Sequence, residues 1–167
     1  MKIAILGNGQ LGSELYENIP QKWMKNIFDY PNFNICNIDQ LHNIVYMHDI
    51  IINCVANIHA DKIEGEEKLD SYNVNYLAVK NLAILCKKYD KTLIHISSDY
   101  VYGSNNYNDN LTETYDCKPI NQYGIDKLAG EQAIINEQLN NYLILRVAWL
   151  FGKNGKVNFI EKLKIIY

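Results

Sequence analysis

The run YGIDK contains the side chains of this chain that are best suited to acid–base chemistry. In a helix that continues through KLAGEQAII, a spacing of four residues places Tyr123 and Lys127 on one face. A free tyrosine has a pKa of about 10, so it exchanges its proton slowly at neutral pH. Because a neighbouring ammonium stabilises the phenolate, we expect Lys127 to lower the pKa of Tyr123 and to make it a general acid or base. The chain has 13 tyrosines, enough for this spacing to arise by chance, so it needs support from other motifs.

A hydroxyl group that can hold a substrate oxygen is expected from Ser98. It lies at the carboxyl end of the apolar run TLIHIS, and open α/β sheets bind their ligands at the carboxyl ends of strands. The neighbouring Ser97 is the nearest alternative, and Asp99 either tunes Ser98 or caps a turn. These residues predict a catalytic trio of Ser98, Tyr123 and Lys127.

A glycine-rich run, GNGQLG, lies near the start of the chain. It follows the apolar run 2–6 and opens an amphipathic segment, which is the context of a dinucleotide-binding fingerprint. Gly7 would allow a tight turn, Gly9 would let backbone N–H groups approach a pyrophosphate, and Gly12 would let helix and strand pack closely. The alternative is a purely structural turn. The expected cofactor-binding residues here are Gly7, Asn8, Gly9, Gln10, Leu11 and Gly12.

Asp29 ends the second apolar run, twenty residues after Gly9. A carboxylate in this place accepts hydrogen bonds from the adenosine ribose of a dinucleotide. The cofactor is therefore expected to be NAD or NADP, and Asp29 favours NAD. The alternative is a surface aspartate without a ligand.

Apolar runs alternate with helical patterns along most of the chain. Strands are expected at about 2–6, 24–30, 49–56, 92–98 and 141–149, and helices at about 13–19, 66–89 and from 121. This alternation predicts an α/β fold with a doubly wound parallel sheet, the NAD(P)-binding Rossmann fold. A length of 167 residues suits one domain of this kind.

The composition argues against several other classes of protein. A net charge of -3 and scattered lysines give no basic surface for nucleic acid, and no apolar stretch is long enough to cross a bilayer. The cysteines lie far apart, which fits a reducing cytoplasm. No metal site is predicted, because the histidines lack ligand spacing, and His95 is expected to be a hydrogen-bonded core residue. These residues are Cys36, Cys54, Cys86, Cys117, His42, His48, His59 and His95.

Several longer motifs occur in order: SSDYVYG, LTETYDCKPINQYGIDKLAGE and RVAWLFG. With GNGQLG and NCVA, they resemble the extended short-chain dehydrogenase/reductase family, and within it the dTDP-4-dehydrorhamnose reductases. The resemblance implies that Ser98, Tyr123 and Lys127 are catalytic and that Lys127 also hydrogen bonds the nicotinamide ribose. It implies a wall beside the cofactor and a set of substrate contacts. The implied wall consists of Asn53, Cys54, Val55 and Ala56, and the implied substrate contacts are Ser98, Asp99, Tyr100 and Trp149. Trp149 could equally be plain packing, and Asp39 either binds adenine or caps the following helix.

The function implied by this resemblance is NAD(P)H-dependent reduction of the 4-keto group of a nucleotide-linked deoxysugar, a precursor of cell-surface polysaccharide. One alternative is a related nucleotide-sugar epimerase or dehydratase, and another is a non-catalytic, cofactor-binding regulatory subunit. The sequence allows a homodimer but does not specify it.

The chain departs from the family pattern in three places. GNGQLG stands where a GxxGxxG pattern is usual, and Ile58 stands where a threonine is frequent. Family members also continue into a lobe that binds the nucleotide sugar, whereas this sequence stops at Tyr167. We therefore expect a dinucleotide-binding domain over 1–150, with 151–167 starting the crossing to a substrate lobe that is truncated or absent.

Overall fold

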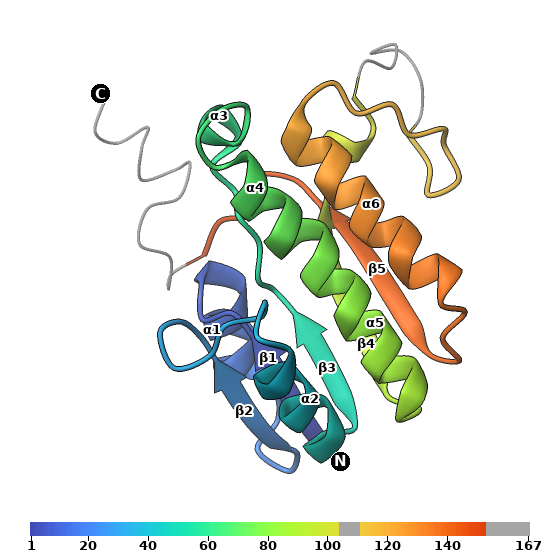
Figure 1. Ribbon diagram of the computed structural model, residues 1–167. Coiled ribbons are helices and arrows are strands. Elements are labelled where there is room, and N and C mark those ends of the chain that lie inside the picture. Colours follow the sequence, from blue (N-terminus) through green and yellow to red (C-terminus); the bar gives the residue numbers. More distant parts are fainter. Residues whose placement is uncertain (104–110, 153–167) are drawn as a thin grey trace.

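Five parallel strands form one sheet in the computed structural model, which describes residues 1–103 and 111–152 (Figure 1). The strand order is β2-β1-β3-β4-β5. The chain thus places β2 on one side of β1 and β3 on the other, so the direction of winding reverses at β1. Ligands of doubly wound sheets bind at the carboxyl side of such a switch point. The strands are β1 (Lys2–Leu6), β2 (Met24–Phe28), β3 (Ile50–Asn53), β4 (Thr92–Ser98) and β5 (Tyr142–Val147).

Helices cover both faces of the sheet. They are α1 (Gln10–Asn18), α2 (Ile38–Met47), α3 (Ala60–Ile63), α4 (Lys68–Ser71), the π-helix η1 (Tyr72–Leu77), α5 (Ala78–Lys88), the 3-10 helix η2 (Asp99–Val101) and α6 (Gln122–Asn136). In Figure 1, α2, α5 and α6 lie in front of the sheet.

Alternation along β1 shows how the core is divided between the two faces. Ala4 and Leu6 belong to the larger apolar cluster, which includes residues of α2, α5 and α6. Ile3 and Ile5 belong to a smaller cluster, where they meet Leu15 of α1. Successive side chains of a strand point to opposite faces, so α1 covers one face and the other helices cover the opposite one. The doubly wound fold predicted from the sequence is confirmed.

The helical region after β3 differs from the prediction of one long helix over 66–89. It consists of α4, the π-helical turn η1 and α5 in direct succession. Helix α2 was anticipated only as a helix after Asp39, and α3 lies in a segment expected to be a charged loop. The strand expected to reach Ala56 ends at Asn53, whose side-chain Oδ1 accepts a hydrogen bond from the N–H of Val55 at 3.1 Å.

Within 1–103 and 111–152, no helix combines the length and the apolar character needed to cross a bilayer. The same residues contain no cluster of three or more His, Cys, Asp or Glu side chains able to hold a metal ion. Most of the predicted crossing segment 151–167 lies outside the described part of the chain.

Candidate active site

Three glycines shape the turn between β1 and α1. Gly7 has a φ of +94°, which favours glycine, and a Cβ there would lie 3.1 Å from the backbone N of Val55. A Cβ on Gly12 would lie 1.9 Å from the carbonyl oxygen of Gly7, so only glycine lets α1 approach the turn this closely. A Cβ on Gly9 would meet nothing within 4 Å, which leaves open space at the N-terminus of α1. The predicted roles of Gly7 in the tight turn and of Gly12 in close packing therefore fit the structure, and the role of Gly9 toward a pyrophosphate stays a prediction.

A pocket of about 210 Å³ opens beside this turn, beyond the carboxyl ends of β2 and β3. Asp29 lines it, together with Val55 and Ala56, which follow β3. The remaining lining residues are Tyr30, Phe33, Asn34, Ile35, Asn57 and Val74. The pocket combines an apolar wall with one carboxylate, and no lysine or arginine is among the described residues that line it. Such a surface suits an adenosine with free ribose hydroxyls.

The two serines at the end of β4 point to different sides of the sheet. The hydroxyl of Ser97 donates a hydrogen bond to the buried carboxylate of Glu131 on α6. The hydroxyl of Ser98 accepts one from the N–H of Tyr100 at 3.2 Å and donates one to Asp99 at 3.0 Å. Ser98 therefore lies at the carboxyl edge of the sheet, which favours it over Ser97.

Tyr123 occupies the first turn of α6, whose N-cap is Asn121. Its side chain is only 9% exposed, and the nearby Ser98 hydroxyl acts to lower the pKa of its phenol. The ring of Tyr100 packs edge-on against it, with the ring centroids 5.5 Å apart. The chain thus brings together Ser98 and Tyr123, which are 25 positions apart in the sequence.

Lys127 lies one turn further along α6 and is 1% exposed. Its Nζ donates a hydrogen bond to the carbonyl oxygen of Ile96 at 2.7 Å and lies 3.4 Å from Nε2 of His95. Burial lowers the pKa of Lys127 to about 8, although Glu131 and Cys54 act in the opposite direction. The lysine therefore changes its charge close to neutral pH.

The pKa of Tyr123 differs from the expectation. Burial raises it, and the hydrogen bond with Ser98 opposes this rise only in part. The charge of Lys127 was expected to lower the pKa of Tyr123. It does not do so, because the lysine head is directed to Ile96 and His95. In the free chain, Tyr123 is thus a neutral phenol at physiological pH.

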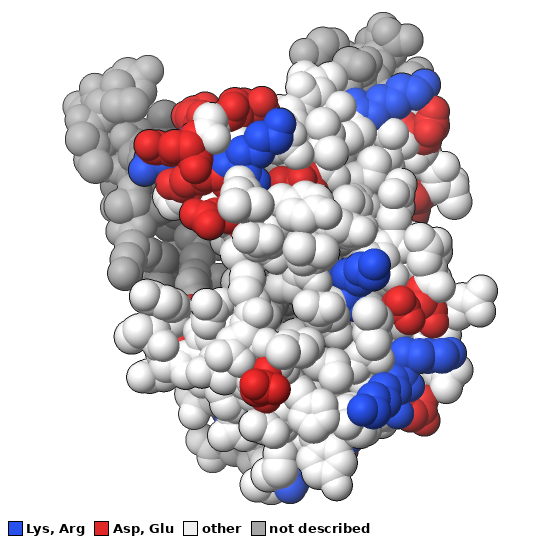
Figure 2. Space-filling view, viewed as in Figure 1, with Lys and Arg blue, Asp and Glu red and all other residues white. Residues whose placement is uncertain are grey.

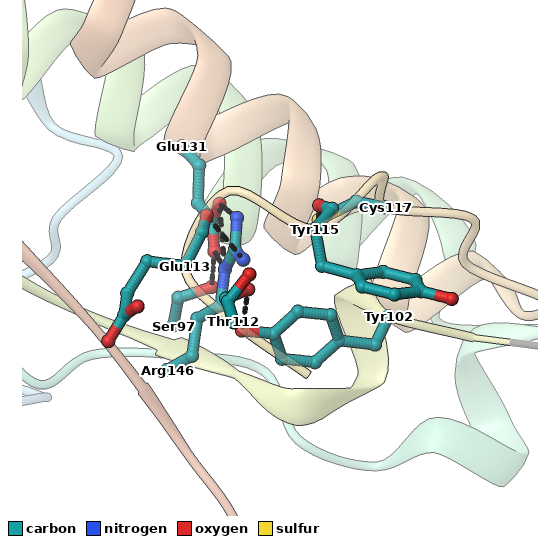
Figure 3. A network of polar contacts seen from close by, with 8 residues as sticks. All are labelled: Ser97, Tyr102, Thr112, Glu113, Tyr115, Cys117, Glu131 and Arg146. Atoms are coloured by element: carbon teal, nitrogen blue, oxygen red, sulfur yellow. Dashed lines mark hydrogen bonds and ion pairs between the residues drawn. The ribbon is translucent and has the colours of Figure 1, made fainter. Parts of the chain in front are cut away.

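A buried ion pair anchors the elements around this site (Figure 3). Glu131 is 1% exposed, and its carboxylate receives hydrogen bonds from Ser97 and from Arg146 of β5, the shortest arginine contact being 2.8 Å. The guanidinium carbon of Arg146 lies 4.8 Å from the centroid of the Tyr102 ring, just after η2. Its Nη1 donates a hydrogen bond to the carbonyl oxygen of Glu113 at 3.3 Å. The pair therefore connects α6, β4, β5 and the segments around Tyr102 and Glu113.

The other predicted residues are placed less centrally. Asp39 is exposed in the first turn of α2, and the capping bonds of that helix come from Asn37, so the capping alternative was wrong. Asp39 also does not line the pocket beside Asp29. Trp149 follows β5 and is 69% exposed, so it is not a core residue. Cys54 follows β3, and burial raises the pKa of its thiol to about 12. Asn8, Gln10 and Leu11 form the turn and the start of α1 between the three glycines.

The sequence prediction missed the ion pair beneath the trio. Glu131 is buried and Arg146 is half-buried, whereas Asn53, which was predicted as part of the cofactor wall, is buried as well. The spacing of four residues that pairs Tyr123 with Lys127 also places Glu131 on the same face of α6, so this carboxylate could have been found. His95 was expected to be a core histidine with a satisfied hydrogen bond, and this is confirmed by its contact with Asn53 at 3.2 Å.

Comparison with known proteins identifies the family. The model of a family described as the RmlD substrate binding domain matches residues 1–164. The chain belongs to this family. A dTDP-4-dehydrorhamnose reductase of Escherichia coli (strain K12) is similar to this RmlD-family chain, with 32% identity over 168 residues, 96% of the chain and 55% of the relative. A protein of the same name from Mycolicibacterium smegmatis is 34% identical over 131 residues, 78% of the chain and 39% of the relative.

Solved structures extend this similarity of the RmlD-family chain to three dimensions. The crystal structure of a dTDP-4-dehydrorhamnose reductase from Bacillus anthracis, in complex with NADP, matches with a TM-score of 0.90 and 34% identity. The matched region covers 99% of this chain and 59% of the Bacillus anthracis chain. A UDP-glucose 4-epimerase of Thermus thermophilus, at 17% identity and a TM-score of 0.84, shares the fold. The RmlD-family chain thus spans between 39% and 59% of the length of these three reductases.

Proposed function

We propose that the protein containing this chain reduces the 4-keto group of a dTDP-linked 6-deoxysugar with NAD(P)H, in the formation of dTDP-rhamnose for polysaccharide. The observation that carries the proposal is that the fold brings Tyr123 of α6 next to Ser98, at the carboxyl edge of the sheet that also carries the glycine turn. The similarity to dTDP-4-dehydrorhamnose reductases supports the choice of substrate. A nicotinamide cofactor would supply the hydride that reduces the keto carbon.

The residues of this chain would handle the proton and the oxygen. Ser98 holds the keto oxygen by a hydrogen bond, and Tyr123 donates its phenolic proton to that oxygen as negative charge develops. Lys127 is proposed to stabilise the resulting phenolate by its positive charge when the cofactor is bound, since in the free chain its head is directed to Ile96 and His95. The phenol is protonated in the free chain, which suits a general acid. Tyr100, packed on the ring of Tyr123, is proposed to contact the sugar, as are Asp99 and Trp149.

The glycine turn and the pocket fit a dinucleotide. Backbone N–H groups at the start of α1 would bind the pyrophosphate in the open space beside Gly9, and Asp29 would accept hydrogen bonds from the ribose. Cys54, Val55 and Ala56 would form the wall beside the cofactor.

The test is oxidation of NADH and NADPH, followed by absorbance, with a dTDP-4-keto-6-deoxysugar as the acceptor. We expect Tyr123→Phe to lose turnover by roughly 10²–10⁴-fold, the usual contribution of a general acid, while cofactor affinity is kept. Tyr46→Phe is the matched control, because Tyr46 is 61% exposed on α2, far from the trio in the sequence. Full turnover by Tyr123→Phe would contradict the role of the tyrosine. A chain that binds the cofactor but reduces no such sugar would contradict the proposal itself.

We also propose a cytoplasmic location and a homodimer for this protein. All four cysteines are free thiols, in agreement with a reducing compartment. Sedimentation equilibrium of the purified protein tests the homodimer, which a monomer at all concentrations would contradict.

A further inference from the structure

A fully buried chain of three side chains, Asn53, His95 and Lys127, connects the lysine of the proposed catalytic trio to β4 and β3. Asn53 of β3 and His95 of β4 are paired neighbours in the sheet, and both are 0% exposed. Lys127 reaches down from α6 to the same imidazole and is 1% exposed. With no solvent around them, these groups depend on each other for hydrogen bonds.

The orientation of the Asn53 amide is fixed by its backbone neighbour. Its Oδ1 accepts the N–H of Val55 at 3.1 Å, and a backbone N–H can only donate. The amide nitrogen therefore faces His95, where it lies 3.2 Å from Nδ1. An amide nitrogen also only donates, so Nδ1 of His95 must be the unprotonated acceptor.

A neutral imidazole carries one proton, which the Asn53 contact leaves on Nε2. Burial and the nearby Lys127 both hold the pKa of His95 well below its usual range, so the ring is neutral. Its Nε2–H then points at Lys127 Nζ, 3.4 Å away. An ammonium has three donors and no acceptor, so a charged Lys127 would place two donors face to face, whereas a neutral amine could accept the imidazole proton.

We propose that Asn53 holds His95 as the Nε2–H tautomer and that this N–H, aimed at Lys127, favours the uncharged form of the lysine. His95 is thereby a positioning residue, because it acts only through Lys127. The consequence for turnover rests on the proposed function: the charge that stabilises the Tyr123 phenolate would be withdrawn as the pH rises through the titration of Lys127.

The other described side chains around Lys127 do not favour its uncharged form. Glu131, on the same helix, favours the charged lysine and is itself paired with Arg146. Cys54 follows β3, and the pKa of its thiol is raised to about 12, so it stays neutral near pH 8. Asp126 of α6 is bonded to Ser71 of α4 at 2.6 Å. The remaining direct contact of Nζ, the carbonyl of Ile96, accepts a hydrogen bond from either form of the lysine.

Nitrogen-15 NMR of the imidazole rings tests the tautomer directly in the wild-type chain and needs no activity. At alkaline pH we expect His95 to show a protonated Nε2 and an unprotonated Nδ1. His48 is an internal control, because its Nδ1 lies 2.7 Å from the carbonyl oxygen of Ile44 and must donate, so His48 should show a protonated Nδ1. A protonated Nδ1 on His95 would overturn the proposal.

The second test measures the pH at which Lys127 loses its charge, by NMR of labelled lysine. The Lys127 signal is assigned by its loss in Lys127→Met. In Asn53→Leu, the imidazole is free to take its proton on Nδ1 and to accept from the ammonium. We expect the Lys127 midpoint to rise by about one pH unit, a tenfold change in its ionisation constant. Asn26→Leu is the matched control, because Asn26 contacts His48 instead, and it should leave the midpoint unchanged. An unchanged midpoint in a folded Asn53→Leu chain would refute the proposal, whether or not the protein reduces a sugar.

Discussion

Substituting alanine at two glycines of the same turn should separate stability from cofactor binding. In Gly12→Ala, the new Cβ would lie 1.9 Å from the carbonyl oxygen of Gly7 and 3.0 Å from its carbon. To reach 3.0 Å from that oxygen, α1 and the turn must move apart by about 1.1 Å. The obstructing atoms belong to the backbone, so no side-chain rotation relieves the clash. The shift must also disturb the packing of Leu15 and Ile19 on β1.

The magnitude follows from two opposing contributions. Overpacking typically costs about 1–3 kcal/mol, and a backbone obstruction belongs at the upper end of that range. Alanine returns at most about 1 kcal/mol through its higher helix propensity. The free energy of unfolding of Gly12→Ala should therefore fall by about 2 kcal/mol, which lowers the Tm by roughly 4–8 °C for a domain of this size.

Gly9→Ala is the matched comparison, since its Cβ would meet nothing within 4 Å. Its stability should change by less than about 1 kcal/mol, the scale of a residue exchange at a helix N-cap. The methyl group would, however, occupy the space proposed for the pyrophosphate, so NADH affinity should weaken by about tenfold or more, or ~1.4 kcal/mol. Urea unfolding measures the first effect and NADH fluorescence titration the second. A Gly12→Ala chain as stable as the wild type would refute the close approach of α1 to the Gly7 turn.

Three further perturbations test other parts of the site. NADH should bind more tightly than NADPH in binding titrations. Asp29→Ala should narrow this preference by about tenfold, because the carboxylate that repels a 2′-phosphate is gone. An unchanged ratio of the NADH and NADPH affinities would contradict this role of Asp29. The fold lowers the pKa of Lys127 to about 8, so the unfolded chain binds more protons than the folded chain between about pH 8 and 10.5. The free energy of unfolding should therefore rise with pH in this range, by up to about 1.4 kcal/mol per pH unit relative to Lys127→Met. Parallel stability curves for these two proteins over that range would contradict the buried, titrating lysine. Arg146→Met should lower the free energy of unfolding in urea by about 3–5 kcal/mol, because it leaves the buried Glu131 carboxylate unpaired. Adding Glu131→Leu should restore much of this stability. Equal losses of stability in the single and double variants would argue against a coupled pair.

The parts of the fold that were predictable from the sequence depend on short-range patterns. The central strands β1, β3 and β4 are largely buried apolar runs, and the role of each glycine follows from its place between a strand and a helix. The N-terminus of α6 was predictable because Asn121 is a favourable cap just before the helix. The π-helical turn was not, because one extra residue per turn over Tyr72–Leu77 hardly alters the apolar spacing.

The direction of the Lys127 head could not be predicted from its spacing to Tyr123. Spacing fixes the helix face, but the long side chain has several rotatable bonds. Its end point is decided by Ile96 and His95, which come from a strand about thirty positions earlier in the chain. The pKa of Tyr123 was mispredicted for the same reason, since the sequence does not record how deeply the phenol is buried.

The π-helical turn η1 has a consequence for how this family can change over evolutionary time. Ser71, just before the π-helical turn, bonds Asp126, and Asn75, within the turn, bonds the backbone of Asn57. Losing one residue here would restore an ordinary α-helix and rotate Ser71 by about 100° relative to α5. Descendants of this sequence should therefore exchange residue types in Tyr72–Leu77 freely at exposed positions, while insertions and deletions there are eliminated by selection.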